Sequence, residues 1–328
     1  MKTKIIRRKI KFAADIIKRG GLVVFPTETV YGLGADALNR YAVKKIYEVK
    51  KRPIDNPLIV HVSDFDQIYK IAKVNKVAKK LMDAFFPGPL TLVMEKKDIV
   101  PNETTASLNT VAIRMPKHKV ALRLIELSET PIAAPSANIA GKPSPTRFEH
   151  VLELKGKVDA IIVGRTEIGL ESTVVDTTVY PVRILRPGAV TQEMLKEHVE
   201  VEAYKGKVLK PKSPGMKYKH YSPDAEVYVF VGEEDRLIRK IKEFAKSLIE
   251  KNYKVGLAVL DPSKFSEFEF VEKLGNDLNE VAKNLFSALI NLDKHVDYII
   301  VQGVESKGIG VAIMNRLEKA SGGKVYRI

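Results

Sequence analysis

The pattern of hydrophobic and polar positions divides the chain into an irregular first part and a regular second part. Up to residue 204, short apolar runs alternate with amphipathic stretches. Apolar runs rich in β-branched residues predict strands, and they lie at 21–27, 57–62, 91–95, 111–115 and 160–164. Apolar residues at helical spacing predict helices over 42–52, 75–85 and 118–128. This mixture predicts an α/β domain with a mixed sheet.

From residue 224 onward the alternation of strand and helix is regular. Helices are predicted at 234–251, 277–294 and 309–320, between strands at 226–232, 254–261, 296–303 and 324–328. A repeated strand–helix unit is typical of a small doubly wound domain with a Rossmann-like core. We therefore expect a first domain over 1–204, a linker over 205–223 and a second domain over 224–328.

The expected linker has an unusual composition. It contains S-P-G-M-K-Y-K-H-Y-S-P at 213–223, whereas passive tethers are rich in glycine and serine. Structureless loops longer than about 12 to 15 residues are uncommon unless they are functional or disordered. Its lysines and tyrosines suit contact with an anionic ligand, and the alternative is a linker that packs on the nearest domain.

Composition narrows the possible functions. The chain has 328 residues, 55 lysines and arginines against 40 acidic residues, and no cysteine. The absence of cysteine excludes disulfides, thiolate nucleophiles and cysteine zinc sites. The formal charge of +15 fits either a polyanionic partner or a lysine-rich surface. No apolar run approaches the roughly 20 residues that span a bilayer, so we expect a cytoplasmic protein without membrane contact.

The glycine pairs at 32–37 and 308–312 superficially resemble a dinucleotide fingerprint. Neither runs from a strand directly into a helix with an acidic residue about 20 positions later. We interpret these glycines as turn residues. The chain also lacks the G-x-x-x-x-G-K-[ST] phosphate loop.

Four segments of the first domain carry candidate chemistry. They are P-T-E-T-V-Y-G-L-G at 26–34, K-K-R-P-I-D-N-P-L-I-V-H at 50–61, A-A-P-S-A-N-I-A-G-K-P-S-P-T at 133–146, and the stretch at 171–188 with E-S-T-V-V-D and R-I-L-R-P-G. Each has a simpler structural explanation, such as a polar turn or cations at a helix end. Together they predict a cleft rich in cations and small hydrogen-bond donors, suited to a triphosphate and an amino acid.

The chain resembles the threonylcarbamoyl-AMP synthases of the long, two-domain form. The resemblance rests on these four segments together with F-P-G-P-L-T and the linker motif, which occur in the same order in that family. The closing G-I-G-V-A-I-M-N-R-L-x-K-A also resembles the second domain of that form. The resemblance implies a YrdC-like twisted mixed-sheet α/β domain with a concave cleft, followed by a smaller Rossmann-like α/β domain.

The resemblance also implies an activity. Such a nucleotidyltransferase combines L-threonine, bicarbonate and ATP into threonylcarbamoyl-AMP and releases pyrophosphate. Mg²⁺ would enter with the ATP phosphates rather than through protein ligands. The product serves the threonylcarbamoyladenosine modification of tRNAs that read codons beginning with A. The implied partners are the small substrates and the downstream transfer machinery, and weak tRNA binding is left open.

The matching motif positions imply roles for individual residues. The implied catalytic set is Lys50, Arg52, Ser136 and Asn138. The implied ATP-binding set is Arg52, Asn56, Thr110, Ser136, Ser144, Arg186, Tyr218 and Tyr221. The implied threonine-binding set is Thr29, His61, Arg114 and Ser172, with Arg114 as the partner of the carboxylate. No general base is assigned.

The linker can now be given a role. Eleven extended residues reach about 36 to 40 Å, which is roughly the width of a domain of this size. We expect 213–223 to act as a lid that shields the hydrolysable mixed anhydride from water.

Two competing functions remain to be weighed. A basic RNA-binding module without adenylating activity would also use the charge of +15. A carbamoyltransferase sharing the YrdC-like domain would need cysteine-rich zinc motifs or a large additional domain, which this chain does not have. The role of the second domain and the oligomeric state stay open.

Overall fold

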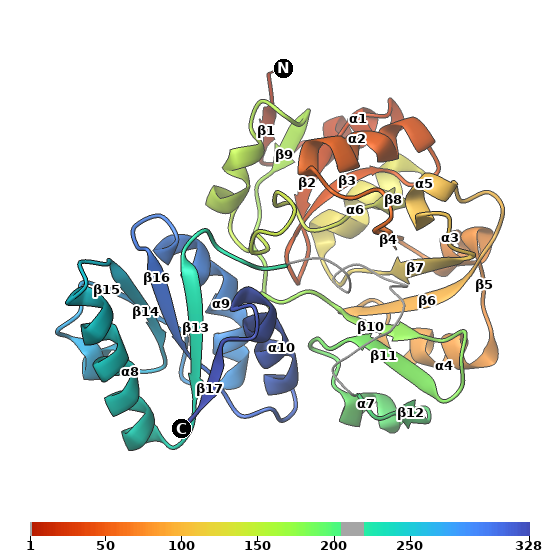
Figure 1. Ribbon diagram of the computed structural model, residues 1–328. Helices are drawn as coiled ribbons and strands as arrows, with labels where there is room; N and C mark the ends of the chain where they lie inside the picture. The colour runs from red at the N-terminus through yellow and green to blue at the C-terminus, as the bar shows by residue number, and fades with distance from the viewer. Residues whose placement is uncertain (1, 205–219) are drawn as a thin grey trace. The chain divides into compact units, whose positions relative to one another are not determined.

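The computed structural model of the protein describes residues 2–204 and 220–328, which fall into two compact units. Unit 1 takes in Met1–Ala140, Pro145–Glu167 and Glu171–Lys217, so far as these are described. Unit 2 takes in Gly141–Ser144, Ile168–Leu170 and Tyr218–Ile328, with the same restriction. Each unit is built on a sheet of its own (Figure 1). The predicted linker falls largely outside the described residues, so its bounds and its role as a lid stay predictions.

Unit 1 is built on a twelve-stranded mixed sheet with the order β1-β9-β2-β3-β8-β4-β7-β6-β10-β11-β12, and β5 pairs with β6. The strands are β1 (Lys4–Ile6), β2 (Val23–Pro26), β3 (Tyr31–Asp36), β4 (Ile59–His61), β5 (Ala72–Lys73), β6 (Leu90–Lys96), β7 (Thr110–Arg114), β8 (Ile132–Ala133), β9 (Ala160–Ile162), β10 (Thr173–Asp176), β11 (Val182–Arg186) and β12 (Val201–Glu202). Strand β7 pairs in parallel with β4 and antiparallel with β6, which confirms the mixed sheet predicted from the sequence.

Helices cover this sheet (Figure 1). They are α1 (Ile10–Lys18), α2 (Arg40–Lys50), α3 (Phe65–Ile71), α4 (Lys76–Phe85), α5 (Asn102–Thr105), α6 (Lys119–Ser128) and α7 (Gln192–Lys196), with the 3-10 helix η1 (Phe148–Leu154). The three helices predicted in this part are confirmed within two residues at each end. Asn39 begins α2, because its side chain accepts hydrogen bonds from the N–H groups of Tyr41 and Ala42.

The two faces of the sheet belong to different hydrophobic clusters. In β2, Val23 and Phe25 join a cluster with Ile17 of α1. Val24 points to the other face and joins a cluster with Leu33 and α2 residues. Successive side chains of a strand lie on opposite faces, so a fully apolar strand such as β2 requires cover on both sides. The sheet is therefore sandwiched between helices in this region.

The glycines at 32–37 do not form a turn, and that interpretation of the sequence is wrong. Gly32 and Gly34 lie inside β3. A Cβ atom on Gly34 would lie 2.7 Å from a ring carbon of Phe25 and 2.8 Å from a methyl carbon of Ile132. These glycines leave room for the Phe25 ring against the strand, a use of glycine where another group approaches closely.

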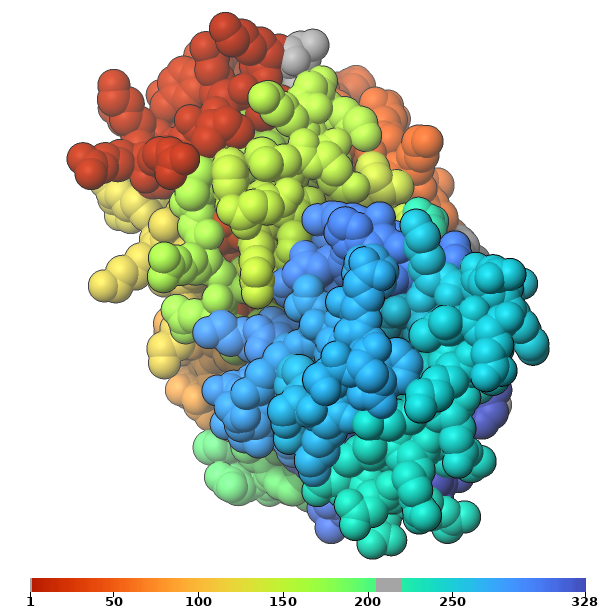
Figure 2. All heavy atoms as spheres, turned by 90° about the vertical axis from the view of Figure 1, so that its left-hand side faces the viewer, coloured from red at the N-terminus to blue at the C-terminus, as the bar shows by residue number. Residues whose placement is uncertain are grey.

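Unit 2 contains a five-stranded parallel sheet with the order β15-β14-β16-β13-β17. The strands are β13 (Glu226–Val231), β14 (Val255–Val259), β15 (Phe270–Lys273), β16 (Tyr298–Gln302) and β17 (Val325–Arg327). The helices are α8 (Glu234–Ile249), α9 (Leu278–Leu292) and α10 (Gly310–Ala320), with the 3-10 helix η2 (Pro262–Phe265). Figure 2 shows the teal-to-blue atoms of the segments around α8 and β15 on one face of this unit. The predicted strand–helix repeat is confirmed, and β15 is an additional strand.

The centre of unit 1 provides a stability prediction. Leu33 is fully buried in β3, so Leu33→Ala should lower the free energy of unfolding by about 2 to 5 kcal/mol. Ile99→Ala removes an exposed side chain and should change it by less than about 0.5 kcal/mol. Urea unfolding followed by circular dichroism measures both variants, and equal midpoints for the two would contradict the assigned core.

Candidate active site

The turn between β2 and β3 is held by hydroxyl groups. The hydroxyl of Thr27 donates to the carbonyl of Val30 at 2.7 Å and accepts from the N–H groups of Thr29 and Val30 at 3.2 and 3.3 Å. The hydroxyl oxygens of Thr27 and Thr29 lie 2.9 Å apart. Both threonines are buried. The P-T-E-T motif is therefore a rigid polar turn, and its side chains have fixed directions.

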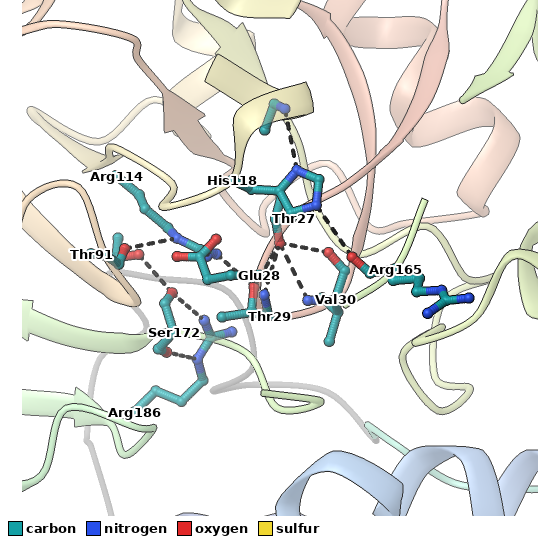
Figure 3. Close-up of polar contacts among 12 residues, drawn as sticks. Thr27, Glu28, Thr29, Val30, Thr91, Arg114, His118, Arg165, Ser172 and Arg186 are labelled. Atoms are coloured by element: carbon teal, nitrogen blue, oxygen red, sulfur yellow. Dashed lines mark hydrogen bonds and ion pairs between the residues drawn. The ribbon is translucent and has the colours of Figure 1, made fainter. Parts of the chain in front are cut away.

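Arg114 reaches this turn from the end of β7 (Figure 3). Its Nη1 donates to the hydroxyl of Thr29 at 2.8 Å, and its Nε lies 3.4 Å from the carbonyl oxygen of Gly88. Its Nη2 lies 2.7 Å from a carboxylate oxygen of Glu28. Arg114 is only 3% exposed. The structure thus fixes the guanidinium group of Arg114 from three directions.

Glu28 is ionised in this arrangement. Burial acts to raise the pKa of Glu28, but the Arg114 guanidinium and the backbone N–H of Lys117 together hold this pKa below its usual value. The charge of Arg114 is therefore balanced by a carboxylate 2.7 Å away.

Ser172 joins a second group of side chains (Figure 3). Its hydroxyl lies 2.7 Å from the hydroxyl of Thr91, and it accepts a hydrogen bond from Nη2 of Arg186 at 3.1 Å. Nε of Arg186 donates to the carbonyl of Ser172 at 3.0 Å. Thr91 follows Gly88 in the motif F-P-G-P-L-T, and Gly88 contacts Arg114. This motif therefore connects the predicted threonine residues Arg114 and Ser172 with the predicted phosphate residue Arg186.

His61 lies next to Arg114 in the sheet, because β4 and β7 pair with these two residues in register. Burial and then the charge of Arg114 lower the pKa of His61 to about 3. The imidazole is therefore neutral at physiological pH. Thr29, His61 and Arg114 are all buried and lie close together, and their role in binding threonine stays a prediction.

Lys50 is buried at the end of α2 and is 1% exposed. Its Nζ donates to the carbonyl of Ser136 at 2.5 Å and also to the carbonyl of Asn138. Burial and then the charge of Arg52 hold the pKa of Lys50 well below its usual value. Lys50 therefore shapes the P-S-A-N loop through its carbonyl groups, and a contact of Lys50 with ATP stays a prediction.

Arg52 folds back on the segment that follows it. Its Nε donates to the carbonyl of Asn56 and its Nη2 to the carbonyl of Pro57, both at 3.0 Å. Arg52 therefore braces the segment that connects α2 to β4. Lys50, Arg52, Asn56, Ser136 and Asn138 form a third group within unit 1.

Four predicted residues remain: Thr110, Ser144, Tyr218 and Tyr221. Thr110 begins β7, and Arg114 ends it, so they are separated by about 13 Å of strand. Ser144 and Tyr221 are buried and belong to unit 2. The Tyr221 ring centre lies 5.2 Å from that of Phe286 and 5.5 Å from the guanidinium carbon of Arg316. Tyr218 lies outside the described residues, and the nucleotide contacts of all four stay predictions.

Sequence reasoning missed three residues that contact the predicted set: Glu28, Gly88 and Thr91. All three lie in motifs that the sequence analysis singled out. Their roles depend on contacts with Arg114 and Ser172, which are distant in the sequence. The motifs therefore contain these residues, and only the fold distinguishes their side chains from their neighbours.

The residue types suit anions rather than a protein-bound metal. Among the described residues, no cluster of three or more histidine, aspartate or glutamate side chains could hold a metal ion. Arginines and hydroxyl groups are instead suited to carboxylates and phosphates. Within the part of the chain that the structure describes, no helix is long and apolar enough to span a membrane.

Comparisons with known proteins identify the family. A family model described as "Telomere recombination" matches residues 15–188, and one described as "Threonylcarbamoyl-AMP synthase, C-terminal domain" matches residues 190–322. The threonylcarbamoyl-AMP synthase of Pyrococcus abyssi is 49% identical over 337 residues, which cover 100% of this chain and 98% of that protein. The chain belongs to the threonylcarbamoyl-AMP synthase family.

Other members of this family agree. The threonylcarbamoyl-AMP synthase of Bacillus subtilis is 44% identical over 332 residues, covering 97% of this chain and 94% of that protein. The crystal structure of P. abyssi Sua5 complexed with L-threonine superposes with a TM-score of 0.94 and 47% identity, covering 100% of both chains. The resemblance and the fold class inferred from the sequence are thus confirmed, and the chain is an enzyme of this family.

The pKa of His61 leads to a pH prediction. The folded pKa of about 3 lies below the unfolded value of roughly 6.5. The unfolded chain therefore binds the proton first, and this contribution to stability is lost as pH falls from about 6.5 towards 3. On going from pH 7 to pH 5, the titration of His61 should lower the free energy of unfolding by about 2 kcal/mol.

Urea unfolding of the wild type and of His61→Gln at the two pH values measures this cost. The wild type should lose about 2 kcal/mol more than the variant on acidification. Parallel losses in the two proteins would show that His61 is not buried in its neutral form.

Proposed function

We propose that this chain synthesises threonylcarbamoyl-AMP from L-threonine, bicarbonate and ATP and releases pyrophosphate. The observation that carries the proposal is the fixed, buried guanidinium group of Arg114 among the hydroxyls of a rigid turn. Such a group binds a carboxylate with directed hydrogen bonds. A full-length relative has been crystallised with L-threonine, which supports the choice of amino acid.

Arg114 would bind the carboxylate of threonine. Thr29 and Ser172 would orient the rest of the substrate through their hydroxyls, and neutral His61 would provide a ring nitrogen. Exclusion of water strengthens the electrostatic interactions in a binding site, and these four residues are all buried. Threonine would thus meet a preformed set of donors and acceptors.

The nucleotide would bind next to this group. Arg52 and Arg186 would neutralise phosphate charge, and the P-S-A-N loop, held by Lys50, would present Ser136 and Asn138. Asn56, Thr110, Ser144, Tyr218 and Tyr221 complete the proposed ATP set. Mg²⁺ would bind through phosphate oxygens, since the arrangement offers cations rather than carboxylates to the triphosphate.

The chemistry needs positioning more than a reactive side chain. The amine of threonine adds to bicarbonate and gives a carbamate with loss of water. A carbamate oxygen then attacks the α-phosphorus of ATP, and pyrophosphate leaves with the electrons of the broken P–O bond. Alignment of reactants and neutralisation of phosphate charge are the dominant effects in such transfers.

The wider setting follows from the product. We propose a cytoplasmic enzyme whose product passes to the machinery that modifies tRNAs reading codons that begin with A.

The proposed domain boundaries follow the sequence. We propose residues 1–204 as the catalytic domain, 205–223 as a linker with a lid role, and 224–328 as the second domain. RNA binding is not proposed as the main function, because full-length relatives are named as synthases.

Incubation of the purified protein with ATP, Mg²⁺ and bicarbonate, with and without L-threonine, tests the function. Pyrophosphate release and mass detection of the acyl adenylate should both depend on threonine. Release that ignores threonine, without the adenylate, would contradict the proposal.

Arg114→Ala tests the carboxylate site. The loss of a preorganised charge contact should reduce kcat/KM for threonine by about 10² or more, while the Kd for ATP changes little. Arg123→Ala is the matched control, because Arg123 is exposed and pairs with Glu126 on its own helix. A variant with unchanged threonine kinetics would remove Arg114 from the site.

A further inference from the structure

The carboxylate of Glu28 is an unusual component of a proposed binding site for an anionic group. Glu28 is 2% exposed and lies in the turn whose hydroxyls face Arg114. Buried ion pairs are often no more stabilising than well-packed apolar residues, because both charges leave water. Fold stability alone therefore gives little reason for this pair.

The ion pair between Glu28 and Arg114 leaves N–H donors of the guanidinium group available to a ligand. A guanidinium carries five N–H donors. In Arg114 one Nη1–H donates to Thr29 and the Nε–H to the carbonyl of Gly88, while Nη2 lies 2.7 Å from a carboxylate oxygen of Glu28 as an ion pair without a directed hydrogen bond. Glu28 therefore holds the guanidinium group in place without using all of its donors.

The charge of the pair is also informative. Glu28 is ionised, Arg114 is a cation, and His61 beside them is neutral at physiological pH. These three residues sum to no net charge. L-threonine is likewise a zwitterion with no net charge, whereas bicarbonate and the phosphates of ATP are anions. An unbalanced arginine would attract all of these anions.

We propose that Glu28 is a positioning and specificity-determining residue, which orients Arg114 and makes the pocket select a zwitterionic amino acid over a simple carboxylate anion. This inference rests on the proposed function, since it assumes that Arg114 binds the threonine carboxylate. The negative charge of Glu28 opposes the entry of any anion that brings no ammonium group. Such repulsive elements are a common source of specificity.

The test compares L-threonine with 3-hydroxybutyrate, which has the same carbon skeleton and hydroxyl group but no amine. Calorimetric titration of the full chain, in the presence of ATP and Mg²⁺, gives the ratio of the two affinities. The wild type should favour threonine by about 100-fold or more, and Glu28→Gln should narrow this ratio by about tenfold or more. A general loss of packing would weaken both ligands and leave the ratio unchanged.

Two further variants act as controls. Glu28→Asp keeps the charge, so its ratio should stay within about threefold of the wild type even if threonine binds more weakly. Glu129→Gln removes an exposed carboxylate that pairs with Lys18 and should change neither affinity. Thermal melting shows whether each variant is folded.

The outcomes separate the inference from the proposed function. Threonine binding by the wild type together with an unchanged ratio in folded Glu28→Gln overturns the inference alone. Comparable wild-type affinities for both ligands overturn it as well, without any variant. No threonine binding by the wild type overturns both the proposed function and the inference.

Discussion

The fixed position of the Arg114 guanidinium is the constraint on which the candidate site depends. Its partners come from the β2–β3 turn and from the F-P-G-P-L-T segment, on separate strands of one twisted sheet. A buried cation requires such partners, because an unpaired charge in the interior is strongly unfavourable. The sheet order and the rigid turn together bring those partners to one place.

The other cations of the predicted site are likewise held in place by the protein. Lys50 is occupied by carbonyl groups of the P-S-A-N loop, and Arg52 by those of the segment after α2. Arg186 is tied to Ser172, which in turn contacts Thr91. Each of these segments is therefore held by a buried or half-buried cation. Preorganisation of this kind is the main contribution that a protein makes to phosphoryl transfer.

Much of the fold could be predicted from periodicity. Helices such as α6 and α9 carry regular apolar positions and were predicted nearly to the residue. Strand β3 was missed, because its glycines resemble a turn and only the nearby Phe25 ring explains them. The role of Glu28 was also missed. That role depends on Arg114, which bonds to Thr29, the residue after Glu28, across 85 positions of the sequence. The pattern of residues around Glu28 contains no information about such a distant partner.

The central claim is that Arg114, held by Glu28, receives the carboxylate of L-threonine. A crystal structure of this protein with L-threonine and no nucleotide tests it most directly. We predict that the carboxylate lies within hydrogen-bond distance of the Arg114 Nη atoms and that the contact between Arg114 and Glu28 is retained. A carboxylate bound to another cation, or an Arg114 that has turned away from Glu28, would contradict the account.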